Sequence, residues 1–141
     1  MINELEHIQD WKTYAMENPS SIVLLQLYIE GTNRITDSDT VRAAFKHNGI
    51  EAPEDMEVGL YAVECIKKMR PDKNFGYIQN PKYLLDIYKQ LQIDISARKQ
   101  YSTIVNALMM LSYEDIAAFA RMISGTWEVP DSVTEGLRCL G

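Results

Sequence analysis

Apolar residues recur along most of the chain at the spacing of one face of an α-helix. The clearest case begins at Tyr83 and Leu84, continues with Ile87 and Tyr88, and ends on Leu91. These residues return every three to four positions, which is the period of an amphipathic helix. Similar stripes predict further helices at about 3–17, 39–47 and 131–139, from Pro53 to Arg70, from Pro81, after Ser96 and after Ser112.

One segment is apolar on every side. Residues 22–29 read Ile-Val-Leu-Leu-Gln-Leu-Tyr-Ile and have no polar face. Such a segment is typical of the centre of a core, either as a helix or as a buried strand, and eight residues do not decide between the two. Pro19 is expected to end the preceding helix, and Ser20 or Ser21 to cap this one.

The middle of the chain carries clear start and stop signals. An acid or hydroxyl within 37–39 is expected to cap the helix at 39–47, and Asn48-Gly49 to end it. Pro53 is expected at the first position of the next helix, where a missing N–H costs nothing. The acids within 54–57 would then lie in its first turn, where negative charge suits the helix dipole.

Helix start and stop signals also occur in the second half of the chain. Asn80, Ser96 and Ser112 each precede an apolar-periodic stretch, and their side chains are good acceptors for the free N–H groups of a first turn. Asp115 stands three residues after Ser112, as in a weak form of the capping box. Gly125 is expected to end that helix.

These elements predict an all-α fold, a compact single-domain bundle of seven or eight helices joined by short loops. With 141 residues, the chain has the length of one ordinary domain over 1–141. The long loop at 71–81 is the one position where a sub-boundary is expected.

The net charge indicates which kind of partner the protein favours, and the cysteines bear on its cellular compartment. The formal net charge is −6, and twelve acids against seven bases in residues 1–70 account for most of it. A net acidic chain is repelled by nucleic-acid backbones and favours a basic protein partner. Cys65 and Cys139 have no CxxC spacing and are expected to be reduced thiols that fill space on helices, although a disulfide stays open. With no signal peptide and no apolar run long enough to span a bilayer, a cytoplasmic location is expected.

No catalytic, cofactor or metal motif emerges from the sequence. His7 and His47 are forty positions apart, and no nucleophile signature surrounds Cys65 or Cys139. The glycines form no phosphate-binding pattern. Catalytic residues, cofactors and metal ligands are therefore all predicted to be absent, although an enzyme with a dispersed carboxylate and tyrosine site stays as a second alternative.

The leading hypothesis is a non-enzymatic protein-binding module, such as a small acidic regulator, inhibitor or immunity-type protein. Acids cluster around Pro53, and tyrosines gather in and after the long loop, where their amphipathic rings suit an interface. The predicted partner-binding residues are Glu51, Glu54, Asp55, Glu57, Tyr77, Tyr83 and Tyr88.

A helix-turn-helix-like DNA-binding regulator is the first alternative. Its second helix would lie at 39–48, and its outward residues would be Thr40, Arg42, Lys46 and His47. Two acids at the start of this helix count against it, because they would be repelled by phosphates. A homodimer is also open, because the methionines at 109, 110 and 122 look like surplus apolar surface.

Overall fold

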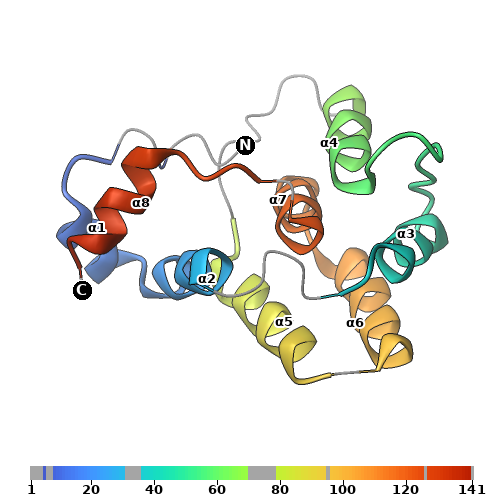
Figure 1. Cartoon of the computed structure of the whole chain (residues 1–141), viewed down its shortest axis with the longest axis horizontal. Coiled ribbons are helices and arrows are strands. Elements are labelled where there is room, and N and C mark those ends of the chain that lie inside the picture. The colour runs from blue at the N-terminus through green and yellow to red at the C-terminus, as the bar shows by residue number, and fades with distance from the viewer. Residues whose placement is uncertain are drawn as a thin grey trace.

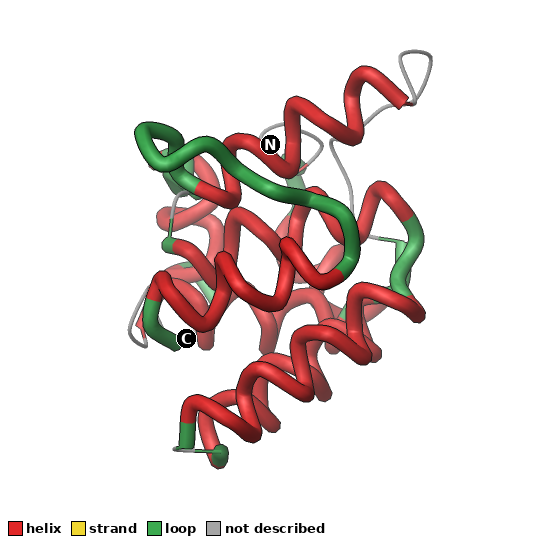
Figure 2. The backbone as a smooth tube through the Cα atoms, turned by 90° about the vertical axis from the view of Figure 1, so that its right-hand side faces the viewer, coloured by secondary structure: helices red, strands yellow, loops and turns green. Residues whose placement is uncertain are grey.

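The computed structural model describes the chain except for residues 1–4, 6–7, 31–35, 70–78, 95, 126 and 141. Over this range the chain is an all-α bundle of eight helices, and no strand is present (Figures 1 and 2). The helices are α1 (Trp11–Glu17), α2 (Pro19–Glu30), α3 (Ser38–His47), α4 (Val58–Met69), α5 (Pro81–Ile93), α6 (Ala97–Met110), α7 (Tyr113–Ser124) and α8 (Asp131–Arg138). The predicted fold class is confirmed. None of the helices described is both long and apolar enough to cross a bilayer.

Three helix pairs build most of the bundle. α4 packs most extensively on α7, α3 packs on α6, and α2 packs on α5. α1 and α8 lie side by side at one end, where the backbone of Gly136 meets the Trp11 ring (Figure 1). The loop between α3 and α4 lies at the right-hand edge of Figure 1 and faces the viewer in Figure 2. The sub-boundary predicted at 71–81 falls largely outside the described residues.

The apolar segment 22–29 is a helix, which settles the alternative left open by the sequence. It forms most of α2, with Leu24, Leu25 and Tyr28 fully buried. The buried hydroxyl of Tyr28 has a hydrogen-bond partner, because it donates to the carbonyl oxygen of Trp127 at 2.8 Å. That bond ties the last turn of α2 to the segment before α8.

The predicted end of the first helix at Glu17, before Pro19, is confirmed, but the predicted cap of the next helix was wrong. α1 ends at Glu17, and Pro19 is the first residue of α2, so Ser20 and Ser21 lie within its first turn and do not cap it. Proline suits the first helical position because no partner is needed for its nitrogen. The first helix is also shorter than the predicted 3–17, because Asp10 caps it by accepting from the backbone N–H of Thr13 at 3.2 Å.

The helix expected from Pro53 begins only at Val58. Residues 53–57 form a loop instead, and Glu54 and Asp55 lie before the helix, outside its first turn. The carbonyl oxygens of Ala52 and Pro53 accept hydrogen bonds from a side chain on α3, so they are oriented away from a helical path. Glu57 caps the helix that does form by accepting from the Leu60 N–H at 3.0 Å.

Other predicted helix limits are confirmed. Asp37, Asn80, Ser96 and Ser112 each accept a hydrogen bond from the backbone N–H three residues later. α3 ends as predicted at Asn48 and Gly49, and α7 ends at Gly125. Both glycines have positive φ, 87° and 71° respectively, which other residues adopt only with strain.

A close helix contact joins α4 to α7 at Gly59. A Cβ atom on this residue would collide with the Ser124 hydroxyl and lie 2.8 Å from the Ala120 carbonyl oxygen. Since Ala62 and Ala117 are also fully buried in these helices, small side chains let the two backbones approach closely.

We expect Gly59→Ala to destabilise the protein by about 1–3 kcal/mol, because the added methyl group overpacks the α4–α7 contact. Helix propensity alone predicts the opposite sign, a gain of up to about 1 kcal/mol. Urea denaturation measures the change, and Lys67→Ala, on the exposed side of the same helix, should stay within about 0.5 kcal/mol of the parent protein. A more stable Gly59→Ala protein would show that α4 and α7 do not pack this closely.

Candidate functional site

A single arginine organises the loop between α3 and α4. Arg42 on α3 donates from Nη1 to the carbonyl oxygens of Ala52 and Pro53, at 2.9 and 3.0 Å, and from Nη2 to that of Met56 at 2.8 Å. The planar guanidinium presents several donors in a fixed geometry, so one side chain can hold several carbonyls at once. The loop is therefore held in place by α3 and is not left to solvent.

The clamped loop presents three acids to solvent. Glu51, Glu54 and Asp55 are exposed, whereas Glu57 is half-buried and uses its carboxylate to cap α4. Glu51 also lies 3.6 Å from the ammonium group of Lys46, in an ion pair whose two side chains are both well exposed. Such a pair contributes little to stability and exchanges easily with another partner. Of the four predicted acids, the structure leaves three available on one fixed segment.

Of the four residues predicted to face outward for DNA contact, only two are exposed. Thr40 is buried and donates its hydroxyl to Asp37 at 2.8 Å. Arg42 is half-buried and holds the loop carbonyls. Lys46 and His47 are exposed, but two side chains at the end of α3 do not make the outward row that a recognition helix needs.

The tyrosines do not form the predicted surface cluster. Tyr88 is only 1% exposed, and burial, with a smaller effect of Tyr28, raises its pKa to about 12. Tyr83 is half-buried against the core, and Tyr77 lies outside the described residues. Tyr88 is therefore a core residue, as its place on the apolar stripe of α5 already indicated.

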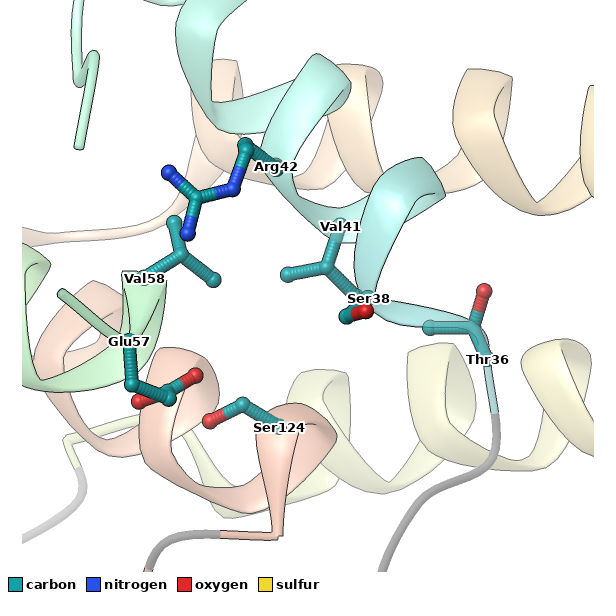
Figure 3. A pocket seen from close by; sticks show the side chains of 7 residues that line it. All are labelled: Thr36, Ser38, Val41, Arg42, Glu57, Val58 and Ser124. Atoms are coloured by element: carbon teal, nitrogen blue, oxygen red, sulfur yellow. The ribbon is translucent and has the colours of Figure 1, made fainter. Parts of the chain in front are cut away.

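A small cavity of about 50 Å³ lies on the α7 side of the clamp (Figure 3). The Arg42 guanidinium forms one side, and the Glu57 carboxylate and the Ser124 hydroxyl point toward one another on another side. Thr36 also lines it, and its buried hydroxyl oxygen has no hydrogen-bond partner among the described residues. The volume suits one or a few water molecules and is far below that of a substrate pocket.

A larger groove of about 580 Å³ opens where α3 ends, between α4, α6 and the start of α7. Its lining is both apolar and polar. Ile50, Tyr61, Cys65, Met69, Leu108 and Tyr113 contribute to it, together with Asn48 and Lys68. Met69 is 53% exposed and Tyr113 38%, so large apolar side chains meet solvent at its edge. The volume lies within the range of ligand and side-chain pockets in proteins.

Charged residues of both signs lie near this groove. A hydrogen bond with the Cys65 side chain raises the pKa of Tyr61, and the negative charges of Glu51 and Glu64 are smaller causes in the same direction. One cation, Lys68, also lines the groove.

Both cysteines are free thiols, as expected, but only one of them fills space in the fold. Cys65 is half-buried in the groove wall, whereas Cys139 is exposed. The three methionines that the sequence suggested as surplus apolar surface also differ in exposure. Met109 and Met110 are 70% and 73% exposed, whereas Met122 is a core residue.

The sequence did not reveal that Asp115, a buried acid, connects two helices. The carboxylate of Asp115 on α7 accepts from the backbone N–H groups of Gln79 and Asn80, at 2.7 and 3.1 Å. Burial raises its pKa, although these bonds oppose the shift. Its spacing after Ser112 signalled a local cap, and the side chain does hydrogen-bond with Ser112, but it also reaches across to the start of α5. Within the described residues, no three His, Cys, Asp or Glu side chains gather where a metal ion could bind.

Comparison with known proteins finds no relative that could identify this surface. No protein-family model matches the chain, and no curated protein or solved structure is significantly similar to it. The function must be inferred from the residues and their geometry.

We expect Arg42→Lys to cost about 1.5–3 kcal/mol of unfolding free energy, because an ammonium group cannot serve all three carbonyls. Amide hydrogen exchange should also speed up across residues 52–60. The matched control is Lys46→Ala on the same helix, which loses only an exposed ion pair and should change stability by less than about 1 kcal/mol. Equal effects of the two substitutions would mean that Arg42 does not hold the loop.

A pH-dependent contribution is expected from the cap of α3. Hydrogen bonds from the Thr40 backbone and hydroxyl lower the pKa of Asp37 from 3.8. Its contribution to stability is therefore complete above pH 3.8 and is lost as the pH falls through the lowered value. The stability advantage of the parent protein over Asp37→Asn should shrink over that interval in thermal unfolding. Asp39→Asn, in the same turn, controls for removal of one charge, and an advantage independent of pH would contradict this role of Asp37.

Proposed function

We propose that the chain is a non-enzymatic protein-binding module, a small regulator or inhibitor whose partner has a basic surface. The observation that carries this proposal is the set of three exposed acids, Glu51, Glu54 and Asp55, on a loop that Arg42 holds at three carbonyls. Charges on a fixed loop lose little conformational freedom on binding, which favours their use in recognition.

Charge gives such a module an advantage in the rate of association. The net charge of −6 attracts a basic partner over a distance of about one Debye length, and the exposed acids then select the face that meets it. Most of the excess negative charge lies in residues 1–70, the half that contains the clamped loop. Both effects weaken with added salt.

The contacts of Arg42 and Thr40 argue against the DNA-binding alternative, because both side chains are committed within the fold. No observation favours the enzyme alternative over binding. A cytoplasmic setting is part of the proposal, and the two free thiols support it, since reduced cysteines are typical of reducing compartments.

The test is capture of partners from a nuclease-treated lysate of the source cell, followed by binding kinetics with the protein recovered. We expect the triple substitution Glu51→Lys, Glu54→Lys and Asp55→Lys to slow association about tenfold or more and to flatten its dependence on salt. Glu57 is left unchanged because it caps α4.

The matched control changes the same amount of charge elsewhere. Asp86, Glu128 and Glu135 are exposed and lie outside the loop, and their reversal to lysine should have a much smaller effect on association. If both triple variants slow association equally, only net charge matters. If neither does, the clamped loop is not the binding site.

A further inference from the structure

The groove where α3 ends has an apolar floor. Ile66, Leu108 and Ile116 line it and are only 0%, 6% and 7% exposed, so they form its inner part. They come from α4, α6 and α7, which together enclose a volume of about 580 Å³. This volume suits a small molecule, and burial of apolar surface is the main gain when such a pocket is filled. The floor therefore favours a ligand with an apolar body.

One face of α4 leads from this floor to solvent. Tyr61, Cys65 and Lys68 all line the groove and recur every three to four positions along the helix. Tyr61 and Cys65 are half-buried, whereas Lys68, in the last turn of α4, is exposed. A lysine can lay its apolar stem along such a wall and keep its ammonium group in water. The wall therefore ends in a cation where the groove meets solvent.

The charge of the lining selects the polar group of the ligand. Lys68 is the one charged residue that lines the groove in the described part of the chain, and no described carboxylate forms an ion pair with it. Glu51 and Glu64 lie nearby but do not line the groove, and Glu51 is 3.6 Å from the ammonium group of Lys46. A negatively charged group can therefore approach Lys68 without meeting an acid of the lining, whereas a cation is repelled.

The size and charge of the chain argue against a polymer in this groove. A polyanion is repelled by the net charge of −6, whereas a single negative charge needs only the local attraction of Lys68. An extended peptide would need backbone groups to pair with. The N–H groups of Gly49 and Ile50 in the lining already donate to Lys46 and Phe45, at 3.0 and 2.9 Å.

We propose that this groove binds a small amphipathic molecule with an apolar body and one anionic group, such as a medium-chain carboxylate. The apolar body packs on Ile66, Leu108 and Ile116, and the anionic group meets the ammonium group of Lys68. The inference goes beyond the proposed function and does not depend on it, because none of the three exposed acids of the clamped loop lines the groove.

The experiment measures alkylation of the two free thiols of the whole chain by iodoacetamide, with and without decanoate, decanol or decylammonium below their micelle concentrations. The three probes share one alkyl chain and differ in the charge of the head group. Decanoate should slow the alkylation of Cys65, which lines the groove, and leave that of Cys139 unchanged, because Cys139 is exposed and lies outside the lining. Mass spectrometry of peptides follows both thiols in one sample.

The concentration of probe that halves the alkylation rate of Cys65 reports its affinity. Decanoate should bind about tenfold more tightly than decylammonium, with decanol between them. Octanoate, which lacks two methylene groups, should bind about tenfold more weakly than decanoate.

Two neighbouring lysines then test the role of charge. Lys68→Gln should weaken decanoate binding about fivefold and leave decanol binding unchanged. Lys67→Gln is the matched control, because Lys67 is equally exposed on the last turn of α4 but does not line the groove. Both side chains are exposed, so neither substitution disturbs the core.

Several results would overturn the inference. Failure of decanoate to protect Cys65, or equal protection of Cys139, would remove the groove as the binding site. Equal affinities for decanoate and decylammonium, or equal effects of Lys67→Gln and Lys68→Gln, would contradict selection of an anion by Lys68. Equal affinities for octanoate and decanoate would show that the alkyl chain does not fill the apolar floor.

Discussion

The hydrogen bonds of Arg42 are the interaction on which this surface depends. Its guanidinium binds three carbonyl oxygens of a loop that would otherwise have to hydrogen-bond with water. Bonds from a charged donor are among the stronger ones in proteins, and a half-buried guanidinium left without them would carry a desolvation cost. The same loop presents the acids to solvent, and the Arg42 side chain lines the small cavity on the α7 side.

Local signals in the sequence were enough to predict most of the helix limits. An N-cap acts within three residues, so Asp37, Asn80, Ser96 and Ser112 could be recognised without knowledge of the fold. Proline was less informative, because it suits both the start of a helix and a loop. The first helix ends before Pro19 as predicted, but Pro19 itself starts the next helix, and Pro53 lies in a loop where a start was predicted.

The candidate site was harder to predict because its partners are distant in the sequence. The acids near Pro53 were visible as a cluster, but Arg42 looked like an outward residue until the carbonyls at 52–56 were placed beside it. The groove gathers residues from the end of α3, α4, α6 and α7, and no periodic pattern links Ile50 with Tyr113. For Tyr88, the apolar stripe was a better guide than the general preference of tyrosine for interfaces.

Short-range contacts connect the start of α3 to the packing of α4. Asp37 caps α3, α3 carries Arg42, Arg42 fixes the loop, and Glu57 at the end of that loop caps α4. α4 in turn meets α7 at Gly59, where there is no space for a side chain. Because each contact restricts the next, the acidic loop cannot relax without loss of either a cap or the α4–α7 contact. The exposed acids therefore belong to a loop whose backbone is held both by Arg42 and by the cap of α4.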